Sequence, residues 1–328
     1  MGDLVLIGSC VGTFFALDRQ TGKVRWSYDI AQDGNQSSFH GSPLVVNDEI
    51  IIGTDGGGIG YVYAFQTATG KVLWKYRITK GAPGEAGVPT DIVRLDDSVF
   101  GVTFGDELIS LHSESGKVNW TFPSGYMAKK FIVPQSPAVG IDRVFFGGIN
   151  GTVYALSAGS GGIIWKRDLG SRVSTNLTVA GADLYAGTAD GYIFRLNTVT
   201  GEIASQMKLE ATPVGWPTLA GNSLLVYLNP DGGSGGASTL LSLDPALKQI
   251  RWQQQTASNW SLTRPFLWRS SVLAGNEKGE VKAFRLSDGA ELWGATLKGT
   301  IRSFGSDKEV IFIGTLGGIV YAYQPAKL

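Results

Sequence analysis

An eleven-residue motif recurs along the whole chain and constrains what it can fold into. Residues 16–26 read ALDRQTGKVRW and residues 64–74 read AFQTATGKVLW, so a small residue opens each copy, glycine stands seventh and tryptophan eleventh. Further copies keep this pattern at Ser110/Gly116/Trp120, Ala155/Gly161/Trp165 and Ala283/Gly289/Trp293. Two copies are altered, one with Ser205 in the tryptophan place and one with Lys248 in the glycine place. The first four glycines lie 48, 46 and 45 residues apart, a period typical of repeat folds.

Each period is predicted to contain four short strands, which we name A to D in chain order. In the second period these are residues 42–46, 49–54, 61–66 and 71–78. Strand B is rich in β-branched residues, as expected for a strand buried on both faces. The Thr-Gly step between C and D is a tight turn in which glycine supplies positive φ. Four antiparallel strands per repeat predict an all-β fold, a β-propeller, as one domain over residues 1–328.

The number of predicted strands is uneven. B–C pairs begin near residues 3, 49, 98, 143, 183, 223, 271 and 309, which makes eight, whereas A and D strands number seven each. The sequence therefore predicts eight four-stranded antiparallel blades, with blades one and eight incomplete at the chain termini. A seven-bladed fold is the alternative if one terminal pair is expelled. Strand exchange or oligomer formation at the incomplete blades, or a trimmed start, would account for the missing strands.

The motif resembles the tryptophan-docking repeat of the quinoprotein (PQQ)-like β-propeller family, over essentially all 328 residues. A large ring on strand D fits between blades only where the facing residue is small, so the tryptophans are expected to be structural. The docking residues are Trp26, Trp74, Trp120, Trp165, Trp252 and Trp293. The family's repeat serves quinoprotein dehydrogenases, outer-membrane assembly lipoproteins and sensor domains. The resemblance therefore implies an eight-bladed fold and a periplasmic or extracellular location, without choosing the function.

Composition narrows the function classes. The chain has 28 basic and 28 acidic residues, so it has no electrostatic footprint for nucleic acid or anionic lipid. Cys10 is the single cysteine, which excludes an internal disulfide and a multi-cysteine metal site. No apolar run has the 18 to 20 or so residues of a transmembrane helix, so the chain is predicted not to span a membrane. Residues 1–8 lack a basic region and are expected to form a strand, not a signal peptide.

If the chain were a quinoprotein dehydrogenase, the resemblance implies that it would carry that class's cofactor-binding residues. Quinoprotein dehydrogenases have an adjacent cysteine pair, a tryptophan floor and calcium held by Glu, Asn and a catalytic Asp. The single cysteine excludes the pair, and no acidic cluster supplies the six to eight oxygens that calcium needs. The glycine-rich segment Gly56–Gly60 lies between two strands and not before a helix, so it is expected to be a turn and not a phosphate-binding loop. Asp231 lacks the spacing of an ion-binding loop and is expected to lie in a flexible linker. No catalytic residue, metal ligand or cofactor is predicted, with PQQ and Ca²⁺ kept as the alternative.

The D–A and B–C loops are expected on one face, with the A strands lining a central funnel. The long loops are residues 31–40, 79–89, 123–135 and 229–237, and residues 127–131 are a candidate partner contact. Candidate ligand-binding residues at the funnel mouth are His40, Ser42, Thr90, Ser136, Thr175, Trp216, Arg264 and Arg302. No acid or nucleophile adjoins His40 in the sequence, so it is expected to form a loop hydrogen bond.

The leading functional prediction is a non-catalytic scaffold that binds a protein partner or extended ligand through the loops and the funnel. A PQQ-dependent oxidoreductase is one alternative. A saccharide or small-molecule sensor is another, with Trp216, Trp260 and Trp268 as stacking platforms.

Overall fold

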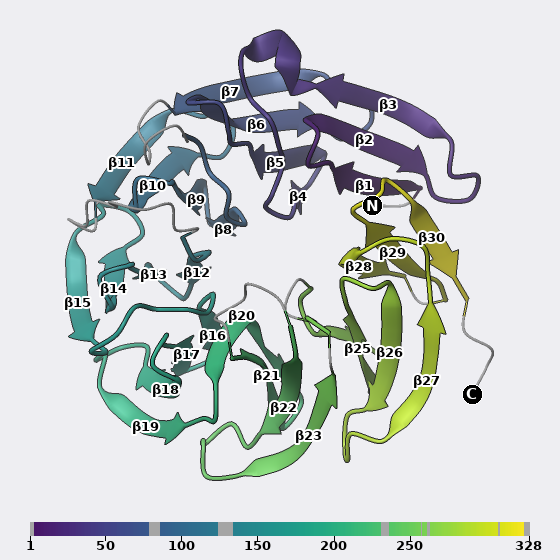
Figure 1. Ribbon diagram of the computed structural model, residues 1–328. Helices are drawn as coiled ribbons and strands as arrows, with labels where there is room; N and C mark the ends of the chain where they lie inside the picture. Colours follow the sequence, from purple (N-terminus) through teal and green to yellow (C-terminus); the bar gives the residue numbers. More distant parts are fainter. Residues whose placement is uncertain are drawn as a thin grey trace. The chain divides into compact units, whose positions relative to one another are not determined.

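The computed structural model describes residues 3–78, 86–123, 134–230, 236–256, 258–260, 263–307 and 309–324. The predictions for residues 127–131 and Asp231, and most of three predicted loops (79–89, 123–135 and 229–237), fall outside these ranges. The chain forms two compact units, Met1–Gly170 and Ser171–Leu328. Regular structure is almost entirely strand, and the one helix among the described residues is the four-residue 3-10 helix η1, Ile30–Asp33 (Figure 1). No described helix could cross a membrane.

The first unit contains four antiparallel sheets, each built from strands consecutive in sequence. Blade 1 has three strands and blades 2 to 4 have four each, with the short A strands on one edge and the D strands on the other (Figure 1). The strands are β1 Leu4–Gly8, β2 Thr13–Asp18, β3 Val24–Asp29; β4 Leu44–Val46, β5 Glu49–Gly53, β6 Gly60–Gln66, β7 Val72–Ile78; β8 Val93–Leu95, β9 Ser98–Val102, β10 Glu107–His112, β11 Val118–Pro123; β12 Ala138–Val139, β13 Arg143–Gly147, β14 Thr152–Ser157 and β15 Ile163–Asp168.

The second unit repeats this arrangement, with four strands in blades 5 to 7 and three in blade 8. Its strands are β16 Thr178–Ala180, β17 Asp183–Gly187, β18 Tyr192–Asn197, β19 Ile203–Lys208; β20 Thr212–Ala220, β21 Ser223–Asn229, β22 Ser238–Leu243, β23 Ile250–Thr256; β24 Phe266–Trp268, β25 Ser271–Gly275, β26 Glu280–Arg285, β27 Glu291–Thr296; β28 Ile301–Ser306, β29 Ile311–Thr315 and β30 Val320–Tyr323.

The structure confirms the predicted fold class, an eight-bladed β-propeller. Blade 1 starts at a B strand and blade 8 stops at a C strand, so the two incomplete blades are those that the sequence predicts. Both terminal sheets are present, which excludes the seven-bladed alternative.

The motif determines the local geometry of the C–D hairpin. Its first residue pairs directly with its eleventh, as in Ala64 with Trp74, and the register then shifts by a β-bulge. The same shift follows the motif's first position in all seven C–D pairs. Gly70 closes the turn with φ of 71°, and its N–H donates to the Gln66 carbonyl. Glycine is favoured there because other residues rarely adopt positive φ.

Each junction between neighbouring blades within a unit contains one buried apolar cluster. Between blades 2 and 3, for example, Ile51 and Val62 pack with Val99 and Leu111, all at most 1% exposed. The B and C strands supply most of these side chains because they are the inner strands of each sheet and both of their faces are covered. The apolar cores therefore lie between sheets, and the functional side chains must come from the ends of the strands.

Candidate functional site

Four small polar residues of the predicted funnel are engaged in the scaffold's own hydrogen bonds. Thr90 and Thr175 are buried, and their hydroxyl oxygens accept from the N–H groups of Val102 (3.0 Å) and Gly187 (2.8 Å). The Ser136 hydroxyl accepts from the Asp91 N–H at 3.0 Å. These three side chains hold strand ends together.

Ser42 belongs to the same network. Its backbone N–H donates to the Asp91 carboxylate at 2.7 Å, while its side chain is exposed. Asp91 thus links the A-strand entrances of blades 2, 3 and 4, through Ser42 on one side and Ser136 on the other. The prediction of a polar rim missed Asp91, which precedes strand β8 and has no motif around it.

In the second unit the structure brings Trp216 and Arg264 together. Trp216 lies in the irregular part of β20, where the register shifts between Val214 and Thr218. The Arg264 guanidinium lies 5.4 Å from the centre of its ring, a cation–π contact. Arg302, on β28, is exposed. Trp260 and Trp268, the other proposed stacking platforms, are 1% and 6% exposed and cannot stack on a ligand without repacking.

The first unit carries a rigid exposed loop between β3 and β4, which we call the Asp33 loop (residues 30–41). The Asp33 carboxylate accepts hydrogen bonds from Tyr28 (2.5 Å), Tyr63 (2.9 Å) and Lys75. Burial opposes ionisation of Asp33, but these hydrogen bonds outweigh it and hold the pKa of its carboxyl below the ordinary value. Gln36, a buried residue of the loop itself, donates to the Ile30 carbonyl and to the Tyr63 hydroxyl. The loop is therefore preorganised by contacts with blade 2.

At the end of this loop, His40 meets a carboxylate that the sequence did not place beside it. Its Nδ1 lies 2.8 Å from Oδ2 of Asp55, a carboxylate whose side chain is 3% exposed. The Asp55 hydrogen bond, and then the influence of Cys10 in the turn between β1 and β2, raise the pKa of His40 to about 10. His40 therefore forms the predicted loop hydrogen bond, and its partner Asp55 comes from another loop that the sequence does not place beside it.

The tryptophans of strand D contact the next blade in the same way at four junctions. Their indole N–H groups donate to the carbonyl at the fourth motif position of that blade, at 2.8–3.0 Å. The donor–acceptor pairs are Trp26–Thr67, Trp74–Ser113, Trp120–Ala158 and Trp252–Leu286. Each ring also packs on the seventh-position glycine, where an added Cβ would lie 2.4–2.7 Å from it. These tryptophans are therefore engaged in packing between blades.

The two altered motif copies meet at one junction, between blades 5 and 6. Ser205 of blade 5 replaces the tryptophan, and Lys248 of blade 6 replaces the glycine on which it would pack. Tyr185 takes over the polar contact, because its hydroxyl donates to the Pro245 carbonyl at 2.9 Å, the same fourth-position carbonyl. Leu247, which has φ of 58°, is buried in the apolar cluster between blades 5 and 6, where it takes the place of the missing tryptophan ring. The junction is thus held by a different set of residues.

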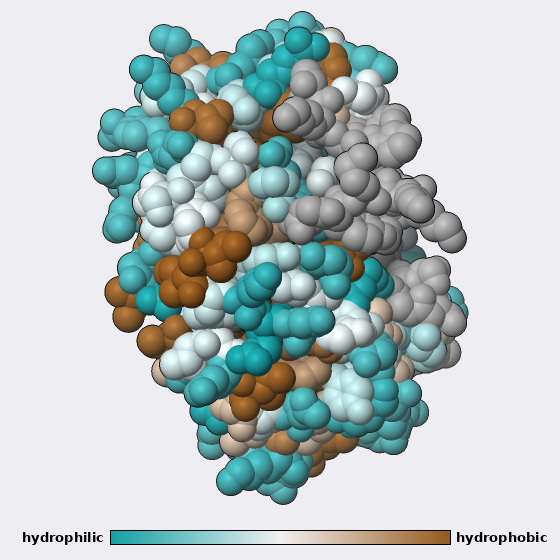
Figure 2. All heavy atoms as spheres, turned by 90° about the vertical axis from the view of Figure 1, so that its left-hand side faces the viewer, coloured by the Kyte–Doolittle hydropathy of each residue, from teal (hydrophilic) through white to brown (hydrophobic). Residues whose placement is uncertain are grey.

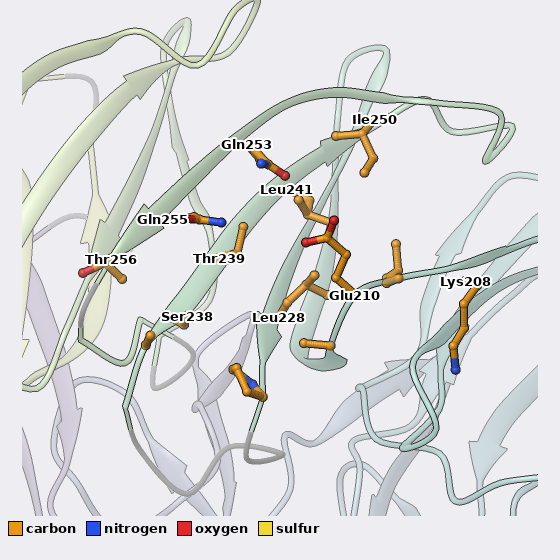
Figure 3. A pocket seen from close by; sticks show the side chains of 14 residues that line it. Lys208, Glu210, Leu228, Ser238, Thr239, Leu241, Ile250, Gln253, Gln255 and Thr256 are labelled. Carbon is orange, nitrogen blue, oxygen red and sulfur yellow. The ribbon is translucent and has the colours of Figure 1, made fainter.

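A pocket of about 620 Å³ opens beside this junction (Figure 3). Apolar side chains such as Leu228 and Leu241 form one part of its lining, and Gln253, Gln255 and Thr256 of β23 form another. Figure 3 shows the Glu210 carboxylate projecting among the strand-borne side chains and Lys208 at the edge. Among the described residues that line the pocket there is no cysteine or histidine, and Glu210 is the single carboxylate.

The exposed apolar residues of the D strands are dispersed over the surface. Val118, Ile163 and Ile203, near the start of D strands, are 40–53% exposed. On the face drawn in Figure 2, apolar side chains form separate groups between hydrophilic ones. Scattered exposure of this kind is normal for a protein surface and does not itself mark an interface. Among the described residues, no group of three or more His, Cys, Asp or Glu side chains is arranged to hold a metal.

Comparison with known proteins places the chain in a family. A family model described as outer membrane protein assembly factor BamB matches residues 1–132 and 132–327. The BamB of Yersinia pestis is 26% identical over 227 residues, which are 68% of this chain and 56% of that protein, so the chain spans little more than half of this curated relative.

Two solved structures share the fold. The crystal structure of BamB from Moraxella catarrhalis has a TM-score of 0.78 at 17% identity, covering 99% of this chain and 94% of that one. A europium-containing methanol dehydrogenase has a TM-score of 0.70 at 13% identity, covering 95% and 81%. At these identities the likeness concerns the fold alone, and it supports the quinoprotein-like repeat. Because the family model extends over nearly the whole sequence, the chain belongs to the family of outer membrane protein assembly factor BamB.

Proposed function

We propose that this chain is a non-catalytic, protein-binding scaffold that acts in the assembly of outer-membrane proteins, on the periplasmic side of that membrane. The observation that carries the proposal is the match of the BamB family model across residues 1–132 and 132–327. Relatives that match in sequence are named for the same role, as assembly factors.

The Asp33 loop is the surface that we assign to the partner. Ala31, Gln32 and Asn35 are exposed, whereas Ile30 and Gln36 are buried and anchor the loop. A loop that is already ordered loses little conformational entropy when it binds, so more of the contact energy appears as affinity. The Asp33–Lys75 ion pair neutralises the charge of the half-buried Asp33. The side-chain amides of Gln32 and Asn35 donate to the Asp29 and Gly57 carbonyls, and we assign their remaining hydrogen-bonding groups to a polar partner.

A site-specific photo-crosslinking experiment tests this assignment. A photoreactive residue replaces Gln32 in the loop or, as a control, Gln20 in the C–D turn at the other end of β3; both glutamines are exposed. Both variants are expressed in the cells that encode the chain, in place of the wild type. We expect cross-links from position 32, but not from position 20, to a component of the outer-membrane assembly machinery.

The functional part of the proposal has its own test. Deletion of the gene is expected to lower the amount of β-barrel proteins in the outer membrane, and the wild-type gene to restore it. Unchanged levels of these proteins after deletion would contradict an assembly role, whatever position 32 cross-links. Cross-links at neither position, with a clear deletion phenotype, would refute only the assignment of the loop.

The two alternative functions have less support. The matching relatives are named as assembly factors, and the dehydrogenase likeness is one of fold, so an oxidoreductase is not favoured. Alcohol-dependent dye reduction by the chain with PQQ and Ca²⁺ would overturn this preference. Two of the three tryptophans proposed for saccharide stacking are buried, and Arg264 lies against the third, which does not favour a sensor.

A further inference from the structure

The pocket of about 620 Å³ in the second unit has a lining that the scaffold function leaves unused. It follows strand β23, from Ile250 at one end to Thr256 at the other (Figure 3). We call this elongated pocket the β23 groove. Six residue steps along a strand extend over about 20 Å, so the groove is as long as an extended chain of about six residues.

Two side-chain amides of the β23 groove are open to a ligand. Gln253 and Gln255 lie two residues apart, so both project from the same face of β23. Both are exposed, and within the described part of the chain neither amide has a hydrogen-bond partner. Their separation along the strand, about 7 Å, equals the repeat of an extended chain, in which every second peptide group faces the same way. A side-chain amide offers both a donor and an acceptor, so each glutamine can bond to a peptide group of a bound chain.

Apolar side chains form another part of the lining. Leu228 and Leu241 are 4% and 2% exposed, whereas Ile250, at the end of the groove, is 45% exposed. Successive side chains of an extended chain point to opposite sides, so a partner with apolar residues at alternate positions would cover Ile250 while its other side chains face water. Covering this apolar surface favours binding.

The charge of the groove favours a basic partner. The Glu210 carboxylate projects among the side chains of β22 and β23 (Figure 3). Glu210 is exposed, and among the described residues it forms neither an ion pair nor a hydrogen bond. The other charged residue of the lining, Lys208, is already engaged, because its ammonium donates to the Asp190 carbonyl and lies 4.5 Å from the centre of the Tyr192 ring. The groove therefore presents a carboxylate without a cation of its own, which is complementary to a lysine or arginine side chain.

We propose that the β23 groove binds an extended polypeptide segment that carries a basic side chain, and that it is a second contact surface besides the Asp33 loop. The basic side chain pairs with Glu210, and the backbone of the segment bonds to the Gln253 and Gln255 amides. An apolar side chain two residues from the basic one covers Ile250. Peptide binding here is independent of the assembly role, because every residue involved belongs to the second unit and the binding is measured on the purified chain.

Fluorescence anisotropy with labelled peptides tests the role of the charge. The probe is the peptide TLTKTLT, blocked at both ends, and its partner TLTQTLT lacks only the charge of the central side chain. At low ionic strength the lysine peptide is expected to bind about two- to fivefold more tightly, the range of a solvent-exposed ion pair, and the preference should disappear at high salt. Glu210→Gln is expected to abolish the preference. Glu202→Gln, which removes an exposed carboxylate just before β19 and outside the groove, should retain it.

A second pair of variants tests the amides. Q253A/Q255A is expected to weaken both peptides equally, by about tenfold, because it removes hydrogen bonds to the peptide backbone and not to the central side chain. Gln206→Ala, which truncates an exposed glutamine of β19 outside the groove, should leave both affinities unchanged. Hydrogen exchange of the wild type should slow in residues 250–256 when the lysine peptide is added.

Equal affinities of the wild type for the two peptides at low ionic strength, or binding of neither, would overturn the proposal. A lysine preference retained by Glu210→Gln would also overturn it, because the carboxylate responsible would then lie elsewhere. Competition by N-acetyl-lysine amide as strong as that by unlabelled TLTKTLT would show that the groove holds an isolated cation and not an extended chain. Self-association of the wild type that Q253A/Q255A abolishes, measured by sedimentation velocity, would make a second copy of the chain the occupant instead.

Discussion

Replacement of one motif glycine by alanine should measure how much the tryptophan contact contributes to stability. Gly116 has φ of 65°, and a Cβ on it would lie 2.4 Å from Cε3 and 2.7 Å from Cδ2 of Trp74. Gly22 occupies the same motif position in blade 1, with φ of 69°, but its Cβ would meet nothing within 4 Å. The two glycines therefore share the backbone requirement and differ in the contact with the ring.

The two costs can be added from general values. The left-handed conformation costs an L-residue about 1–2 kcal/mol, and Gly22→Ala should lose only this amount of unfolding free energy. Forcing a methyl group into a packed site costs about 1–3 kcal/mol more, so Gly116→Ala should lose about 2–5 kcal/mol in total. The Trp74 hydrogen bond to the Ser113 carbonyl, 2.8 Å long, would also have to lengthen as the ring moves.

Urea unfolding, followed in parallel by tryptophan fluorescence and far-UV circular dichroism, measures both losses. Trp74→Leu removes the ring that the methyl group strikes, so in this background Gly116→Ala should cost no more than Gly22→Ala does in the wild type. Losses for Gly22→Ala and Gly116→Ala that agree within about 0.5 kcal/mol would refute the reasoning, because that is the margin for independent sites.

Three further predictions follow from other contacts. Tyr185→Phe should destabilise the second unit by about 1 kcal/mol in urea melts, because the Pro245 carbonyl loses its donor; Tyr192→Phe serves as the comparison. His40 has its pKa raised to about 10, mainly by Asp55, so its stabilising contribution should be complete below pH 6.5 and decline as pH rises toward 10. Thermal melts across this range should show the decline in the wild type and His112→Gln but not in His40→Gln. Arg264→Ala should alter the fluorescence of Trp216 and cost about 0.5–1 kcal/mol, and an unchanged spectrum would argue against the cation–π contact.

Much of the fold could be predicted because the information is local. The motif encodes a turn that needs a glycine and a ring that needs a small partner, and both requirements lie within eleven residues. Because the motif and its strands repeat, counting them in the sequence predicted the number of blades and the two that are incomplete. The A strands were the least accurate element: residues 42–46 were predicted in blade 2, whereas β4 is Leu44–Val46. Short strands of three residues carry too few side chains to define their ends.

The candidate site was less predictable because its contacts join loops. His40 is a candidate from its position, but its hydrogen-bond partner Asp55 lies 15 residues later, in another loop. Asp91, which links three blade entrances, has no sequence signal at all. The sequence also does not show which polar atoms are bonded to the backbone, as the Thr175 hydroxyl is to the Gly187 N–H.

The sequence by itself determined the repeat, the turn chemistry and the blade count, since these depend on residues close together in the chain. The tertiary structure decided that Ser205 and Lys248, two separate departures from the motif, face one junction where Tyr185 and Leu247 replace the missing ring. It also decided that His40 meets the buried carboxylate of Asp55 at the end of one loop. Contacts between segments depend on how the sheets pack, and packing is a property of the whole unit that no local pattern records.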